Sequence, residues 1–155
     1  MQFQNYITFE NIYLWANFGL IPFWLMLIII PRSKFTQFFV NSIILPLIIA
    51  CAYIYIIYQS FLLDDPFLDV FKLYLSIENL YTIFATESFL LVFWLHFLAL
   101  NLFLGSWISL DGVKYNIPQS IVTLPLILVY LIGPLGLVLY WLIRVFYAKK
   151  LGFHD

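Results

Sequence analysis

The chain has 155 residues, of which 65% are hydrophobic and only 10% are charged. This leaves too little polar surface for a soluble domain of this size, so we expect an integral membrane protein. A formal net charge of −1 gives no basic surface for a nucleic acid, and the single cysteine, Cys51, excludes a disulfide within the chain.

The hydrophobic runs predict four membrane spans, because a helix needs about 20 mostly apolar residues to cross a bilayer. In chain order they cover residues 11–30, 39–63, 89–110 and 121–146. No small-residue cleavage site follows the first run, which we therefore keep as a span. The predicted fold is all-α, an integral membrane four-helix bundle that forms a single domain over residues 1–155.

The segment from about 67 to 85, between the second and third spans, differs in character from both. Lys72 and Glu78 make it a poor spanning helix, while its many aromatic residues make it a poor solvated loop. We expect an additional interfacial or re-entrant amphipathic helix here.

The charges give conflicting indications of sidedness. Arg32 and Lys34 mark a cytoplasmic turn after the first span, which puts the N-terminus outside. Four spans would then put Arg144 and the lysines after it outside as well. Five spans would bring these cations inside, but only with Lys72 and Glu78 in the bilayer. We prefer four, because a charge at mid-membrane costs at least ~2.5 kcal/mol.

The third span carries polar residues that a plain anchor does not need. A polar group that faces hydrocarbon without a partner costs several kcal/mol. His96 and Asn101 therefore each imply a neighbouring helix, a cavity or a polar ligand, and we expect the His96 imidazole to be buried at bilayer depth. At 100° per residue, His96 and Asp111 lie near one helix face and Asn101 near the opposite one. A single interhelical hydrogen bond is the alternative explanation for His96.

Proton transfer is the chemistry that these residues fit. One histidine and a neighbouring carboxylate can act as general acid and base on an apolar substrate without a cofactor. The only other histidine, His154, lies in the C-terminal tail, so we predict no metal site. We predict His96, Asp111 and Glu87 as catalytic residues. The same groups could carry protons in a transporter, but the chain shows no inverted repeat.

The predicted ligand-binding residues are polar, aromatic or small side chains within the first and third spans. Pro22 predicts a kink near Asn17, and such a kink can form part of a pocket. Gly105 allows a flat ligand or another backbone to approach the helix closely. The set is Asn17, Trp24, Trp94, Asn101, Gly105 and Trp107.

Three stretches of the chain share a pattern with a known family. They are His96, Leu98-Ala99, Asn101, Leu102-Phe103, Gly105, Trp107-Ile108 and Asp111; Ala16-Asn17, Pro22-Phe23-Trp24, Pro31-Arg32 and Thr36; and Gly133-Pro134-Leu135-Gly136. In order and spacing they resemble the ABA4-like membrane family, named after the plant protein required for neoxanthin formation. One departure is Asn101, where plant-type members carry aspartate.

The resemblance implies a four-span protein connected with carotenoids. In plants the family is tied to conversion of the epoxide violaxanthin to the allene neoxanthin. This redox-neutral isomerisation needs an acid at the epoxide oxygen and a base at a carbon-bound proton, which fits the cofactor-free residues above. The plant transit peptide is missing, which favours a bacterial member in the cytoplasmic membrane.

Two hypotheses follow from the sequence. In the first, the protein is an isomerase-type enzyme that binds a carotenoid or other apolar isoprenoid and uses His96 with Asp111 or Glu87. In the second, it is a non-enzymatic protein that holds a pigment or docks a partner enzyme or a second copy. The aromatic content of 21% suits either, because aromatic rings line polyene sites and also fill membrane bundles.

Overall fold

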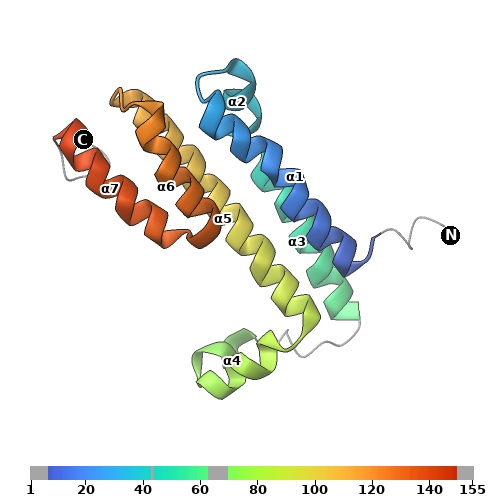
Figure 1. The fold of residues 1–155 in the computed structure, drawn as a ribbon. Coiled ribbons are helices and arrows are strands. Elements are labelled where there is room, and N and C mark those ends of the chain that lie inside the picture. The colour runs from blue at the N-terminus through green and yellow to red at the C-terminus, as the bar shows by residue number, and fades with distance from the viewer. Residues whose placement is uncertain (1–6, 43, 63–69, 150–155) are drawn as a thin grey trace. The chain divides into compact units, whose positions relative to one another are not determined.

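The computed structural model describes residues 7–42, 44–62 and 70–149, and every regular element in these ranges is helical. This confirms the prediction of an all-α chain. The helices are α1 (Phe9–Ile29), α2 (Lys34–Phe39), α3 (Ile44–Leu62), the 3-10 helix η3 (Val70–Tyr74), α4 (Ile77–Phe84), α5 (Glu87–Lys114), α6 (Gln119–Ile132) and α7 (Pro134–Ala148) (Figure 1).

Three helical segments in the described ranges are long and apolar enough to cross a membrane. They are Phe9–Ile29, Lys34–Ser60, which includes α2 and most of α3, and Glu87–Lys114. The first three predicted spans correspond to these segments, although residues 43 and 63 of the second lie outside the described residues. The chain is thus a membrane protein by the length and composition of its helices.

Internal packing divides the chain into two compact units. Unit 1 comprises Met1–Gly19 and Leu47–Leu98, and unit 2 comprises Leu20–Pro46 and Ala99–Asp155. The helices α1, α3 and α5 contribute residues to both units.

The structure corrects the fourth predicted span, residues 121–146, which is two helices rather than one. The helix α6 ends at Ile132 and α7 begins at Pro134. Gly133 between them has φ +54° and ψ −89°, a conformation that glycine adopts far more readily than other residues. Proline then starts the next helix, because its missing N–H is not needed in a first turn.

The helices α6 and α7 lie side by side as a hairpin within unit 2 (Figure 1). Gly136 allows the close approach, since a Cβ atom at this position would lie 2.6 Å from the carbonyl oxygen of Pro125. Gln119, at the start of α6, donates hydrogen bonds to the carbonyl oxygens of Leu27 (3.1 Å) and Ile28 (3.0 Å) at the end of α1. These contacts fix where the hairpin begins.

The segment predicted as one amphipathic helix over 67–85 contains two short helices, η3 and α4, and residues 67–69 lie outside the described part. Ser76 caps α4 by accepting a hydrogen bond from the Asn79 N–H at 3.2 Å. Within α4 only Ile83 is buried, and Ile77 and Tyr81 are exposed. An interfacial location for this segment stays a prediction.

Candidate functional site

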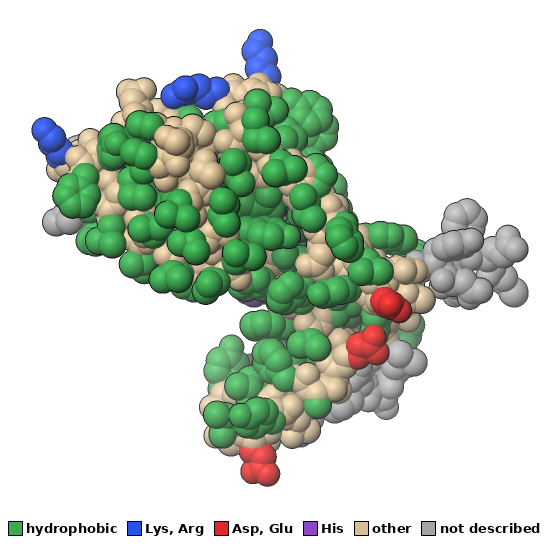
Figure 2. Space-filling view, in the orientation of Figure 1, with side chains coloured by type: hydrophobic (Ala, Val, Ile, Leu, Met, Phe, Trp, Pro, Cys, Tyr) green, Lys and Arg blue, Asp and Glu red, His purple; other side chains and the backbone are tan. Residues whose placement is uncertain are grey.

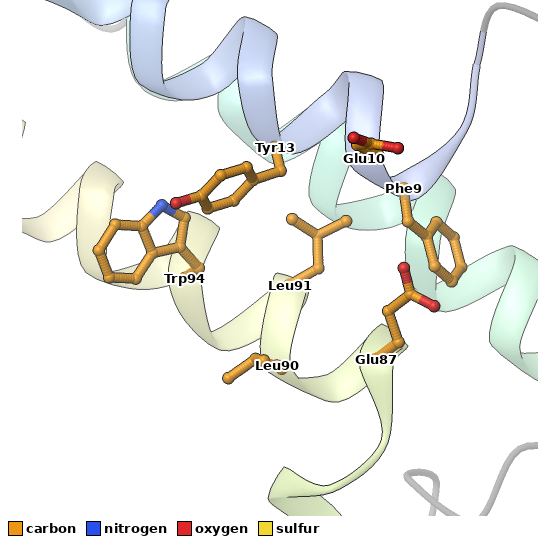
Figure 3. Close-up of a pocket in the computed structure, with 7 residues that line it drawn as sticks. All are labelled: Phe9, Glu10, Tyr13, Glu87, Leu90, Leu91 and Trp94. Atoms are coloured by element: carbon orange, nitrogen blue, oxygen red, sulfur yellow. The ribbon is translucent and has the colours of Figure 1, made fainter.

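Unit 1 contains a pocket of about 470 Å³ that is lined by aromatic rings, leucines and two carboxylates (Figure 3). The lining residues from α1 are Phe9, Glu10 and Tyr13, and those from α5 are Glu87, Leu90, Leu91 and Trp94. Within each set, residues three or four positions apart, such as Phe9 and Tyr13 or Glu87 and Leu91, share one face of the helix.

The two carboxylates of the pocket come from the first turns of two different helices. Glu10 lies in the first turn of α1 and Glu87 in the first turn of α5. An acidic residue is favourable at these positions because it faces the positive end of the helix dipole. Both side chains are exposed, so a ligand in the pocket can reach them.

Trp94 forms one wall of the pocket and is held in place by Asn17. The indole Nε1 of Trp94 donates a hydrogen bond to Asn17 Oδ1 at 3.1 Å, and Asn17 Nδ2 donates to the Tyr13 carbonyl at 2.7 Å. The Tyr13 phenol points toward the indole, with ring centroids 6.1 Å apart (Figure 3). The structure thus brings together three residues predicted from the sequence, Asn17, Trp94 and Glu87.

Asp111 lies in unit 2 and is buried in an ion pair. Its Oδ2 accepts hydrogen bonds from Arg144 Nε at 2.8 Å and from the Tyr140 hydroxyl at 2.7 Å. Arg144 is fully buried, and its Nη2 donates to the Tyr115 hydroxyl at 3.2 Å. The carboxylate therefore connects α5 to α7, and its part in proton transfer stays a prediction.

The family model of ABA DEFICIENT 4-like proteins matches residues 11–140. The chain belongs to the ABA4-like family. Neither the curated proteins nor the solved structures contain a match to it. Membership connects this membrane protein with carotenoid metabolism, in agreement with the resemblance of its three sequence stretches.

Several residues that carry the ABA4-like resemblance form tight packing contacts in unit 2. A Cβ atom on Gly105 would lie 2.5 Å from the Trp24 ring, so only glycine leaves room for this indole. The Trp24 ring also packs edge-on against Tyr130, with centroids 5.3 Å apart. Thr36 donates from its hydroxyl to the Ile30 carbonyl at 2.8 Å and closes the turn between α1 and α2. These residues position the helices.

Asn101 contacts the hairpin turn of this ABA4-like chain. A Cβ atom on Gly133 would lie 2.6 Å from Asn101 Oδ1, so the turn packs directly against the amide. Asn101 is 6% exposed, and its Nδ2 has no hydrogen-bond partner among the residues that the structure describes. Trp107 packs edge-on against Tyr140 in the same unit, with centroids 5.7 Å apart. Thus Trp24, Gly105, Asn101, Trp107 and Asp111 all belong to unit 2.

His96 is exposed on α5, which overturns the prediction of a buried imidazole. It follows Trp94 by two residues, which is about 200° around a helix, and Trp94 faces the unit 1 pocket. His96 therefore points away from the side of α5 that lines this pocket. The sequence predictions missed Glu10 in the pocket and Arg144 as the partner of Asp111. A search for a partner for every buried charge would have linked Arg144 to Asp111.

Proposed function

We propose that this protein binds the polar end of a carotenoid or related isoprenoid in the unit 1 pocket and isomerises it by acid/base chemistry. The observation that carries the proposal is the presence of two carboxylates, Glu10 and Glu87, beside aromatic rings in one pocket. Aromatic and leucine side chains suit an apolar ligand, and a few polar groups fix its orientation. Family membership supports a carotenoid as the ligand.

The location of Glu10 and Glu87 at the starts of their helices supports binding of the polar end of the pigment in particular. Glu10 and Glu87 lie at the starts of two segments long enough to cross a membrane, and such ends lie near the headgroups. An amphipathic pigment would leave its oxygen-bearing ring at this level, with its polyene in the hydrocarbon. We propose the cytoplasmic membrane of a bacterium as the setting.

The chemistry needs one protonated and one ionised carboxyl group. The acid gives its proton to the epoxide oxygen as the carbon–oxygen bond breaks. The base removes a proton from a carbon of the adjacent chain, and the electron pair of that C–H bond forms the new double bond. Atoms and electrons balance without a redox partner, and transfer of one proton between the carboxyl groups restores the starting state. We assign no step to His96 or Asp111.

Pigment analysis in a bacterial host that makes epoxide-bearing carotenoids tests this function. We expect the wild-type protein to convert the epoxide, and Glu87→Gln and Glu10→Gln to lower conversion by about 10²-fold or more. The matched control is Glu78→Gln, which changes an exposed carboxylate on α4 that does not line the pocket. It should convert pigment as the wild type does, and His96→Ala should as well.

Two outcomes separate enzyme from binding protein. Conversion that persists in both pocket variants contradicts the assignment of acid and base. A pigment that copurifies with wild-type protein in stoichiometric amount, without any conversion, favours the non-enzymatic alternative. In that case Asn17→Ala should still reduce the pigment bound, because Trp94 loses the hydrogen bond that holds its ring.

A further inference from the structure

The exposed charges in the described part of unit 2 all have one sign. Within its described residues, the only acidic side chain is Asp111, which is buried against Arg144. The exposed charged residues are Arg32, Lys34, Lys114 and Lys149. The Lys and Arg side chains in view in Figure 2 lie toward its upper end, where Figure 1 draws α2, and at its left edge, where Figure 1 draws the C-terminal end of α7.

The α6–α7 hairpin returns to the end of unit 2 where it starts. Gln119 ties the start of α6 to the end of α1. The turn at Gly133 meets Asn101, about halfway along α5, and Arg144 near the end of α7 pairs with Asp111 near the end of α5. The hairpin therefore extends from the C-terminal end of α5 to its middle and back again.

Neither helix of the hairpin is long enough to cross a bilayer. The helix α6 has 14 residues and α7 has 15. At a rise of 1.5 Å per residue they are about 21 and 22 Å long, whereas the hydrocarbon core is about 30 Å thick. A segment that enters and does not cross leaves the chain on the side from which it came.

We propose that α6 and α7 form a re-entrant hairpin, and that Arg32, Lys34, Lys114 and Lys149 form one cationic surface that binds the anionic headgroups of a single leaflet. With three crossings instead of four, the end of α1, the end of α5 and the end of α7 all lie on one side. This removes the conflict in the charges of the sequence, because all four cations then lie inside.

A pocket on this surface supports the lipid part of the proposal. It has a volume of about 470 Å³ and lies between the turn after α1 and the turn after α5. Its polar lining comes from Arg32, Ser33, Asn116 and Gln119, and its apolar lining includes Ile29 and Ile117. A cation beside apolar side chains matches the phosphate and the first chain carbons of a phospholipid.

Cysteine accessibility tests the topology. In a Cys51→Ser background, single cysteines replace three exposed residues: Ser120 in the first turn of the hairpin, Lys149 just after its end, and Gln37 on α2. An impermeant maleimide is applied to spheroplasts and to inverted membrane vesicles of a bacterial host. We expect all three to react from the same side, and at least tenfold faster in inverted vesicles. Reaction of Ser120→Cys and Lys149→Cys from opposite sides would overturn the re-entrant hairpin.

Lipid retention tests the leaflet surface. The protein is purified from nanodiscs that contain equal amounts of phosphatidylglycerol and phosphatidylcholine, and retained lipid is measured by native mass spectrometry. We expect wild type to enrich phosphatidylglycerol several-fold, and the triple variant Arg32→Gln, Lys34→Gln, Lys114→Gln to lose this enrichment. The control Lys72→Gln removes an exposed cation of unit 1 and should keep it. Equal retention of both lipids by wild type would overturn the lipid assignment, and neither test depends on pigment chemistry.

Discussion

Gly133 adopts a backbone conformation in which other residues are strained, and its Cα faces the Asn101 amide. We expect Gly133→Ala to lower the free energy of unfolding by about 1–3 kcal/mol through backbone strain alone. A further loss follows from the clash of the new methyl group with Asn101 Oδ1, 2.6 Å away. Thermal unfolding in detergent micelles measures the change as a lower Tm.

Gly19 provides the matched control for this substitution. It lies within α1, and a Cβ atom there would have no neighbouring atom within 4 Å. Gly19→Ala should therefore raise stability by about 0.5–1 kcal/mol, because alanine is the better helix former. Equal effects of the two substitutions would show that the hairpin turn does not require glycine.

For single residues, the sequence predicted the important positions more accurately than it predicted their roles. Asn17, Trp94 and Glu87 were predicted and share one site, because side chains at helical spacing share a face. His96 was predicted to be buried on the cost of a polar group in lipid, but this cost does not specify which neighbour covers a given face. The partner of Asp111 lies 33 residues away in the chain, so no local pattern reveals it.

The ion pair of Asp111 and Arg144 joins the helices α5 and α7. Substitutions in this pair test how strongly it holds the hairpin against α5. We expect Arg144→Met to lower the free energy of unfolding by about 3–5 kcal/mol, because the buried carboxylate loses its cation. Adding Asp111→Asn should recover most of this loss, since no unpaired charge remains. Unfolding in sodium dodecyl sulfate titrations measures both variants.

Lys149→Met serves as the control for Arg144→Met. It removes a cation of the same region, but the side chain is exposed, so stability should change by less than about 0.5 kcal/mol. If the double variant were no more stable than Arg144→Met, the interaction of the two side chains could not account for the loss.

Hydrophobicity predicted the existence of the long helices but not the break between α6 and α7. The mean hydropathy of residues 121–146 is that of a spanning helix, whereas the break depends on the backbone conformation of Gly133 alone. The sequence Gly133-Pro134-Leu135-Gly136, which carries part of the family resemblance, lies at this break. The reversal of chain direction at this point also depends on the close approach of α6 and α7 that Gly136 allows, and this approach is a property of tertiary packing.

For the whole molecule, orientation in the membrane should depend on the cations of unit 2. Removing Arg32 and Lys34 together, as Arg32→Gln with Lys34→Gln, weakens the charge bias after the first span. We expect a fraction of the chains to insert with the opposite orientation. The measurement is the share of Lys149→Cys protein that an impermeant maleimide labels in intact spheroplasts, which should rise from near zero.

Lys72→Gln is the counterpart of that variant. Lys72 is an exposed cation of unit 1, and its removal should leave orientation unchanged or make it more uniform. If both variants raised the labelled share equally, net charge rather than the location of the cations would control insertion.

The short helices of the hairpin also bear on how the chain is assembled. Because α6 and α7 are each too short to span a bilayer, we expect the two helices to insert into the lipid together. Their docking points, Asn101 and Asp111, belong to α5 and are available only once α5 has been inserted. We therefore expect a fixed order of biogenesis, in which the hairpin of α6 and α7 is added to a scaffold of three inserted segments.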